Sequence, residues 1–269
     1  AARAEVHQAL FLVPAGGGGP RRLTGEGASY AAPQFAADGS ALYARATSEN
    51  RYVYSDARLV RFDWAAADPR PVAFGFQRSV GDFQVSPDGE TVWLLAEDEG
   101  HDRLFAVAAT GGAVREVGRL ERGSLAGLQA GGPEDAPVLV ANWDSAVSPA
   151  ELQRIEPETG ERRVLTAFNA ARVAEIDWQP VQEFWFTSKR GRRIHNLVAL
   201  PPGFDPSQKY PLFVLIHGGP HTMIKDQFFI RWNYHLLAEP GYVVLMPNYT
   251  GSTGFGEDFA RRIQGDPLK

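Results

Sequence analysis

The chain has 269 residues, 44% of them hydrophobic, a formal net charge of −5 and no cysteine. This length and composition provide for a sizeable core, in one large domain or two smaller ones. The acidic balance, without a basic run, argues against nucleic acid as a partner. The lack of cysteine excludes disulfides and thiolate metal sites. No apolar run approaches the roughly 18 residues of a membrane span, so we expect a soluble protein, with cytoplasm and periplasm both open as compartments.

Four strand-like segments recur through the first two thirds of the chain. They begin at Leu10, Leu59, Leu104 and Leu152, which are 49, 45 and 48 positions apart. Each is followed by a turn rich in Gly, Pro or Asp and then by a second strand-like segment. The turns cover residues 14–20, 63–70, 108–112 and 157–160. A period of about 45–50 residues built from short strands is typical of β-propeller blades, and the alternative is a β-sandwich with accidental regularity.

Asp-Gly pairs between apolar segments mark further turns in this region. Asp38-Gly39 and Asp88-Gly89 have this form, and residues 131–137 form a weaker counterpart. Asp-Gly in this setting is a strong hairpin signal. We therefore predict adjacent four-stranded antiparallel blades of an incomplete propeller in residues 1–180, with the four leucines above in equivalent strand positions.

The last third of the chain changes character. Residues 183–187 and 196–200 predict an antiparallel pair, and residues 212–216 predict a strand buried on both faces. Phe228, Trp232 and Leu236 recur at helical spacing and predict a helix that leads to a second buried strand at 242–246. Strand, helix and strand over this length predict a parallel crossover. A glycine-rich loop at 247–256 and a short helix at 257–263, closed by residues 265–267, complete the chain.

The strand at 212–216 runs into His217-Gly218-Gly219-Pro220. Glycine carries no Cβ, so two in succession let the backbone approach a ligand closely. A His-Gly-Gly loop after a central strand is how α/β-hydrolases bring a backbone N–H to an oxyanion. Residues 181–269 are therefore predicted to be the first segment of an α/β-hydrolase domain.

Together these motifs resemble the prolyl oligopeptidase family of serine peptidases, in its acylaminoacyl-peptidase and dipeptidyl-peptidase-like branch. The resemblance rests on residues 210–221, 232–233 and 241–256, of which Asn248-Tyr249-Thr250-Gly251-Ser252 is part. Thr250 is a departure, because many relatives carry Arg there. The resemblance implies a seven-bladed propeller that limits access to the site, short peptides as substrates, cleavage near their N-termini, and no cofactor.

The nucleophile expected for such an enzyme is missing from the sequence. Relatives carry it in a Gly-x-Ser-x-Gly turn, followed by Asp and then His. No such turn occurs here, and Ser252 in Gly251-Ser252-Thr253-Gly254 has the wrong spacing. The resemblance implies that the triad lies beyond Lys269 and that the first blades are also missing. We expect an internal fragment that is inactive alone and packs against the rest of its polypeptide; a homo-oligomer is compatible with the sequence.

The resemblance assigns one catalytic group to this chain, the backbone N–H of Gly219, with Gly218 shaping its loop. His217, Asn248, Tyr249 and Gly251 are candidates for lining the substrate cleft, and a purely structural use of these residues is left open. His217 and His221 are not expected to be catalytic, and His217 should bond to neighbouring loops. Phe228 and Trp232 are expected in the core. The other histidines lack ligand-like spacing, so no metal site is predicted; they are His7, His101, His195 and His235.

Two other functions remain open at this point. A carboxylesterase would use the same machinery on esters instead of peptides. A propeller that binds partners and has lost catalysis would lack the Ser, Asp and His altogether.

Overall fold

The computed structural model describes residues 7–50, 52, 54–63 and 69–266. Outside the described residues lie the start of the chain, positions 64–68 of the predicted turn 63–70, and Pro267 of the predicted closing segment. Within these ranges, no helix combines the length and apolar character needed to cross a membrane.

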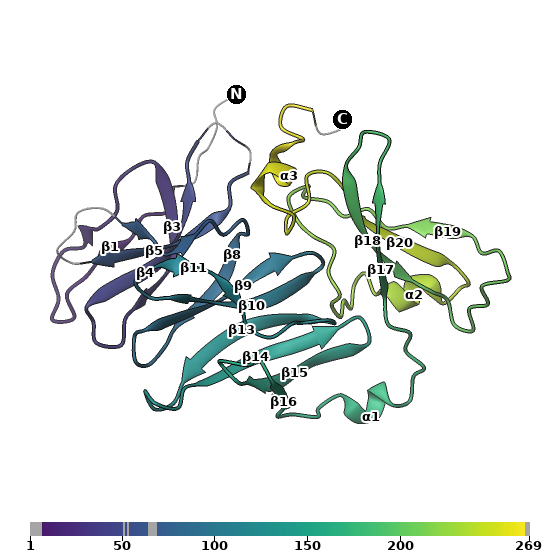
Figure 1. The fold of residues 1–269 in the computed structure, drawn as a ribbon, viewed down its shortest axis with the longest axis horizontal. Helices are drawn as coiled ribbons and strands as arrows, with labels where there is room; N and C mark the ends of the chain where they lie inside the picture. The colour runs from purple at the N-terminus through teal and green to yellow at the C-terminus, as the bar shows by residue number, and fades with distance from the viewer. Residues whose placement is uncertain (1–6, 51, 53, 64–68, 267–269) are drawn as a thin grey trace.

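Three four-stranded antiparallel sheets make up most of the first two thirds of the described chain (Figure 1). In each sheet, neighbouring strands are antiparallel and follow chain order from one edge to the other. The first sheet contains β3 (Ala28–Phe35), β4 (Ala41–Ser48), β5 (Ala57–Asp63) and β6 (Arg70–Pro71). The second contains β8 (Val80–Val85), β9 (Thr91–Asp98), β10 (His101–Ala108) and β12 (Arg115–Glu116). The third contains β13 (Ser124–Gly131), β14 (Val138–Ser145), β15 (Ser148–Ile155) and β16 (Arg162–Val164).

The four repeated leucines occupy equivalent positions, as predicted. Leu59, Leu104 and Leu152 lie in the third strand of their sheets, and Leu10 directly precedes β1 (Phe11–Leu12), which pairs with β2 (Arg21–Arg22). Each leucine carbonyl accepts a hydrogen bond from the backbone N–H 13 positions later, at 2.8–3.0 Å. The same hydrogen bond at four places confirms that the repeat in the sequence is a repeat in structure. The pair β1–β2 corresponds to the last two strands of such a sheet.

The Asp-Gly turns form the predicted hairpins. Gly39 connects β3 to β4 with φ of +70°, and Gly89 connects β8 to β9 with φ of +73°. Glycine adopts this left-handed conformation without a steric penalty. The N–H of Gly39 donates to the carbonyl of Ala36, and that of Gly89 to the carbonyl of Ser86, both at 2.9 Å. The weaker predicted turn, at residues 131–137, joins β13 to β14.

The second sheet is covered on both faces by its neighbours. Leu94 packs in one buried cluster with Tyr43 and Leu59 of the first sheet. The adjacent residue Trp93 packs in another with Leu139 of the third sheet. Successive residues of a strand point to opposite faces, so the apolar run in β9 serves two interfaces at once. A minor parallel pair, β7 (Ala73–Phe74) with β11 (Gly112–Ala113), also links the first two sheets.

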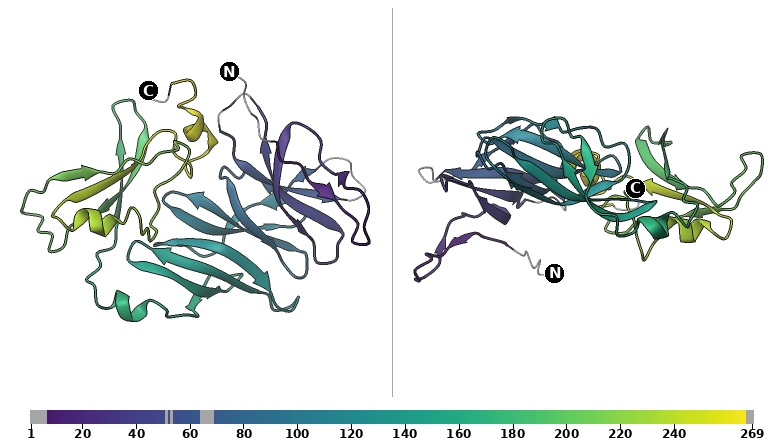
Figure 2. Two further views of the ribbon diagram at one scale, coloured as in Figure 1. Left: turned by 180° about the vertical axis from the view of Figure 1, so that it is seen from behind. Right: turned by 90° about the horizontal axis from the view of Figure 1, so that it is seen from below.

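The C-terminal part forms a mixed sheet in the order β17-β18-β20-β19. It lies beside the three sheets of the first part, as both views of Figure 2 show. Its strands are β17 (Gln182–Thr187), β18 (Arg193–Ala199), β19 (Leu212–Val214) and β20 (Val243–Asn248). The short helices are α1 (Ala170–Val173), α2 (Tyr234–Ala238) and α3 (Glu257–Arg261). β17 and β18 are antiparallel, and β19 and β20 are parallel. The predicted pair and the predicted parallel crossover are therefore both present.

The predicted helix through Phe228 and Trp232 is wrong in its extent. α2 begins only after Asn233, whose side-chain oxygen accepts hydrogen bonds from the N–H groups of His235 and Leu236 at 3.0 and 3.1 Å. Phe228 lies outside α2, and its N–H donates to the Asp144 carboxylate at 3.2 Å. The core assignment of Trp232 is also wrong, because this residue is 53% exposed.

The strand at 212–216 is shorter than predicted and is not buried. β19 is the edge strand of its sheet, and Leu212 is 59% exposed and Val214 43% exposed. Ile216, just beyond β19, is 66% exposed. The prediction of burial on both faces is therefore wrong for the described residues, in which no further strand pairs with β19 and its apolar side chains and outer edge are open.

Candidate active site

The loop after β19 carries the predicted backbone donor. Gly218 and Gly219 are exposed, and Gly219 has φ of +125°. A Cβ at Gly219 would lie 3.1 Å from the backbone N of His221 and 3.2 Å from Cγ2 of Thr222, so a side chain there would be strained and crowded. Within the described ranges, no group accepts a hydrogen bond from the Gly219 N–H. The loop thus offers a free donor at the carboxyl end of a parallel strand, where α/β sheets bind ligands.

His217 ties this loop to the loop after β20. Its ring stacks on Tyr249, with centroids 4.4 Å apart and planes at 18°. Its Nε2 lies 2.8 Å from Oγ of Ser252, and its Nδ1 lies 3.0 Å from the Gly218 carbonyl oxygen. The Tyr249 hydroxyl donates to the carbonyl of His217 at 2.5 Å. The predicted bonding of His217 to a neighbouring loop is therefore present.

Asn248 and Gly251 lie next to these loops but are enclosed by protein. Asn248 is fully buried, and its Oδ1 accepts from the N–H of Ile224 at 2.7 Å. Its Nδ2 lies 3.0 Å both from the carbonyl of Ile224 and from Nδ1 of His195. A Cβ at Gly251 would lie 2.7 Å from Cδ1 of Ile263. The polar groups of Asn248 thus bond to other groups of the protein, and the missing Cβ of Gly251 makes room for Ile263.

The two glycine loops lie where the C-terminal part meets the first sheets (Figure 1). His221 has its ring 4.9 Å from that of Tyr54, which precedes β5, and its Nδ1 lies 3.0 Å from the carbonyl of Gly251. Nearby, the N–H of Glu99 donates to the carbonyl of Gly254 at 3.1 Å. The candidate site is therefore bordered by both parts of the chain.

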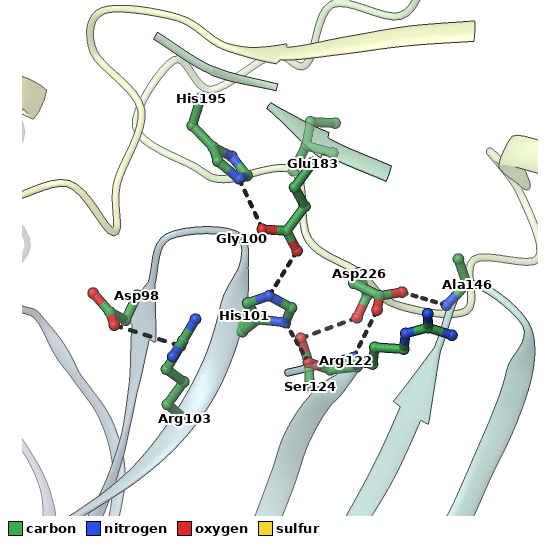
Figure 3. A network of polar contacts seen from close by, with 12 residues as sticks. Asp98, Gly100, His101, Arg103, Arg122, Ser124, Ala146, Glu183, His195 and Asp226 are labelled. Atoms are coloured by element: carbon green, nitrogen blue, oxygen red, sulfur yellow. Dashed lines mark hydrogen bonds and ion pairs between the residues drawn. The ribbon is translucent and has the colours of Figure 1, made fainter. Parts of the chain in front are cut away.

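A carboxylate whose side chain is 37% exposed joins the two parts of the chain (Figure 3). Glu183 on β17 lies 2.9 Å from Nε2 of His101 on β10 and 3.5 Å from Nε2 of His195 on β18. Nδ1 of His101 lies 2.7 Å from the carbonyl of Gly123. Gly100 permits this approach, because a Cβ there would lie 2.8 Å from the ring of His195.

The partners of the two rings determine their charges. The Gly123 carbonyl and the Glu183 carboxylate only accept hydrogen bonds, so both nitrogens of His101 donate and the ring is an imidazolium. Nδ1 of His195 instead accepts from the amide of Asn248, so that ring is neutral. Burial disfavours the charge on His101, but the hydrogen bonds to Glu183 and to Gly123 outweigh it and raise the pKa of His101. Burial likewise opposes ionisation of Glu183, and the bonds from both rings lower its pKa to about 2.

Asp226 forms a second connection between the parts (Figure 3). It is buried, and its carboxylate accepts from the N–H groups of Gly123 and Ala146, both at 2.7 Å. Its neighbour Lys225 places Nζ 2.8 Å from the carboxylate of Asp102. One short segment of the C-terminal part thus contacts both the second and the third sheet.

Sequence reasoning missed this interface. Glu183 and His101 are 82 positions apart, and Asp226 and Gly123 are 103 apart, so no local pattern links them. The one local signal is the polar pair His195-Asn196 between apolar residues of β18. In the described part of the chain, no group of three or more His, Asp or Glu residues is arranged to hold a metal ion.

Known proteins match this chain both in sequence and in fold. The model of the prolyl oligopeptidase family matches residues 227–267. Dipeptidyl-peptidase 5 of Trichophyton schoenleinii is 30% identical over 275 residues, which is 96% of this chain and 37% of that protein. Dipeptidyl-peptidase 5 of Porphyromonas gingivalis is 29% identical over 234 residues, or 87% of this chain and 34% of that protein.

Among solved structures, the acylaminoacyl peptidase of Pyrococcus horikoshii has a similar fold, with a TM-score of 0.77 at 24% identity. The match covers 95% of this chain and 37% of that one. This chain therefore spans roughly a third of the length of the curated relatives it matches. The predicted resemblance is confirmed: the chain belongs to the prolyl oligopeptidase family.

Proposed function

We propose that this chain is part of a serine peptidase that hydrolyses short peptides near their N-termini, of the dipeptidyl or acylaminoacyl type. The names of the matched relatives support this class of substrate. The free N–H of Gly219, at the end of a parallel strand, is the observation in this molecule that carries the proposal.

The proposal assigns an architectural role to each part. Residues 1–180 are successive blades of a β-propeller that limits access to the site, and β1–β2 are the last strands of one further blade. Residues 181–269 are the opening segment of an α/β-hydrolase domain. The exposed edge of β19 supports this assignment, because parallel strands are normally covered on both faces.

The chemistry is acyl transfer. A serine hydroxyl attacks the scissile carbonyl, a histidine takes its proton and passes it to the leaving amine, and an aspartate orients that histidine. These three residues belong to sequence other than the 269 residues here, since no Gly-x-Ser-x-Gly turn occurs among them. The Gly219 N–H donates to the carbonyl oxygen as it becomes negative. Loss of one such donor typically costs about 100-fold to 1,000-fold in kcat.

The remaining candidate residues take different roles in this proposal. His217 and Tyr249 are half-buried beside the exposed glycine loop and form one wall of the cleft. Asn248 and Gly251 support that wall from the protein side, since they already contact Ile224, His195 and Ile263. No cofactor enters the reaction, and the partners are the peptide and the rest of the polypeptide.

The test uses the full-length protein with a fluorophosphonate that labels activated serines. We expect one label per chain, together with turnover of N-acylated or dipeptidyl substrates at higher kcat/KM than of simple esters. Preferential ester turnover would identify a carboxylesterase with the same machinery. No labelling and no turnover would indicate a propeller protein without catalysis.

A further inference from the structure

The turn between β9 and β10 has an unusual backbone conformation. Glu99 has φ of +47° and Gly100 has φ of +90°. Two-residue hairpin turns with positive φ at both positions favour Asn, Asp or Gly, because a residue with a longer side chain is strained there. Glu99 does not fit this preference, and residues in such a conformation persist where surrounding contacts fix them. Here those contacts come from the C-terminal part.

Both residues of the turn bond to the C-terminal part through their backbone. The N–H of Glu99 donates to the carbonyl of Gly254 at 3.1 Å. The N–H of Gly100 donates to Sδ of Met223 at 3.2 Å, and its carbonyl accepts from the N–H of Asp226 at 2.9 Å. The turn therefore contacts two separate segments, one that follows the glycine loop after β19 and one that follows β20.

These two segments also contact each other beside the turn. The N–H of Thr253 donates to the carbonyl of Thr222 at 3.1 Å, and a Cβ at Gly254 would collide with Sδ of Met223. Thr222 in turn lies against the glycine loop, since its Cγ2 would be 3.2 Å from a Cβ at Gly219. A shift at Met223 is therefore only one residue away from a contact with Gly219.

A second path from the turn runs through buried side chains. A Cβ at Gly100 would lie 2.8 Å from Cε1 of His195. Nδ1 of His195 accepts from the amide of Asn248 at 3.0 Å, and Oδ1 of Asn248 accepts from the N–H of Ile224 at 2.7 Å. His195 and Asn248 are both buried, and close-packed interiors transmit such displacements to their neighbours.

We propose that the Glu99–Gly100 turn is a positioning element of the candidate site, which holds the loop after β19 and the loop after β20 in their relative places. Its three backbone hydrogen bonds to both segments carry this inference. The second sheet thus does more than limit access to the cleft, because it supports the loops that form it. This inference rests on the proposed function.

The first test compares two alanine substitutions in the full-length protein. Gly100→Ala places a methyl group against His195, whereas Gly89→Ala, at the other end of β9, meets nothing within 4 Å at a similar φ of +73°. Both variants strain one turn of the second sheet, but only Gly100→Ala should lower kcat on a peptide substrate, by about 10-fold to 100-fold. KM should stay within about threefold of wild type. Rates are divided by the number of sites that a fluorophosphonate labels at completion, so unfolded protein does not lower kcat.

A second pair decides the matter even if Gly100→Ala does not fold. Met223→Leu is close to isosteric and removes the sulfur that accepts from the Gly100 N–H, so kcat should fall about threefold, the size of a weak hydrogen bond. Met246→Leu is the matched control, because this methionine is fully buried within β20 and should leave kcat unchanged.

Wild-type kcat in the folded Gly100 and Met223 variants, or equal losses in their controls, would overturn the inference and leave the proposed function intact. A full-length wild type without peptide turnover would overturn both.

Discussion

The two parts of this chain differ in how completely they enclose their apolar surface. The second sheet of the first part is covered on both faces, and Leu94 there is fully buried. In the C-terminal sheet, the equally apolar strand β19 leaves its side chains open. An apolar cavity of about 350 Å³ also opens beside α2, lined by Trp178, Phe228 and Leu236 among others.

This difference reflects two ways of building a core. In the first part, each sheet packs against a face of the neighbouring sheet. Every added repeat therefore buries the open face of the one before it. The C-terminal sheet contains a parallel crossover unit, β19 and β20, and such a unit needs elements on both faces and further strands at its edge. An exposed edge of this kind is also prone to associate with other chains.

The largest expected effect is on catalysis. These 269 residues, purified alone, should show no peptide hydrolysis and no fluorophosphonate labelling, because no Gly-x-Ser-x-Gly turn occurs among them. The full-length protein is the positive control for both assays. Stoichiometric labelling of the short chain would show that a nucleophile exists within it. It would contradict the proposal that the C-terminal part is only the opening segment of a catalytic domain.

A matched pair of leucine substitutions sharpens the comparison of the cores. Leu94→Ala empties a fully buried position and should lower the free energy of unfolding by about 2–5 kcal/mol. Leu212→Ala removes a side chain that is 59% exposed and should change it by less than about 0.5 kcal/mol. Both are measured by denaturant unfolding of this chain. Equal losses would mean that β19 is as enclosed as β9.

The contact between the parts should depend on pH. Folding raises the pKa of His101, so the stability that this ring contributes is complete below its ordinary pKa of 6.5 and is lost as pH rises through the raised value. Folding lowers the pKa of Glu183 to about 2, so its contribution is present above its ordinary pKa of 4.5 and is lost as pH falls toward 2. The ion pair of His101 and Glu183 should therefore stabilise the folded chain most between its two ordinary pKa values, 4.5 and 6.5.

Glu183→Gln tests this contact. The variant removes the carboxylate, so the loss of stability above pH 6.5 should become shallower than in wild type. Melting temperature across pH 4–9 is the measurement, and Glu158→Gln is the control, because Glu158 is an exposed carboxylate paired with Arg115. A wild-type profile in Glu183→Gln would mean that His101 does not depend on Glu183 for its charge.

Local signals predicted the first part well. The leucine period and the Asp-Gly pairs act over a few residues, and the strands pair with their neighbours in sequence, so spacing alone was informative. The helix through Phe228 was wrong in its extent: Phe228 lies outside α2, and its N–H donates to the carboxylate of Asp144, a contact between distant segments that spacing does not encode. The bonds of Glu183 and Asp226 could not be predicted for the same reason, since each joins segments far apart in the chain.

The candidate site was predicted only in outline. The two glycines and their place after a strand followed from the sequence and its resemblance to known peptidases. The partners of His217, and the burial of Asn248 and Ser252, depend on how two separate loops meet, which spacing does not encode.

Gly219→Val in the full-length enzyme tests the central claim most directly, with kcat and KM measured on a peptide substrate. The new side chain would meet His221 and Thr222 at a φ of +125° and displace the peptide, although its N–H survives. We expect kcat to fall about 100-fold to 1,000-fold, with a far smaller change in KM. Gly25→Val, in open space at ordinary φ, should match wild type. An unchanged kcat in folded Gly219→Val would contradict the assignment of Gly219 as an oxyanion donor.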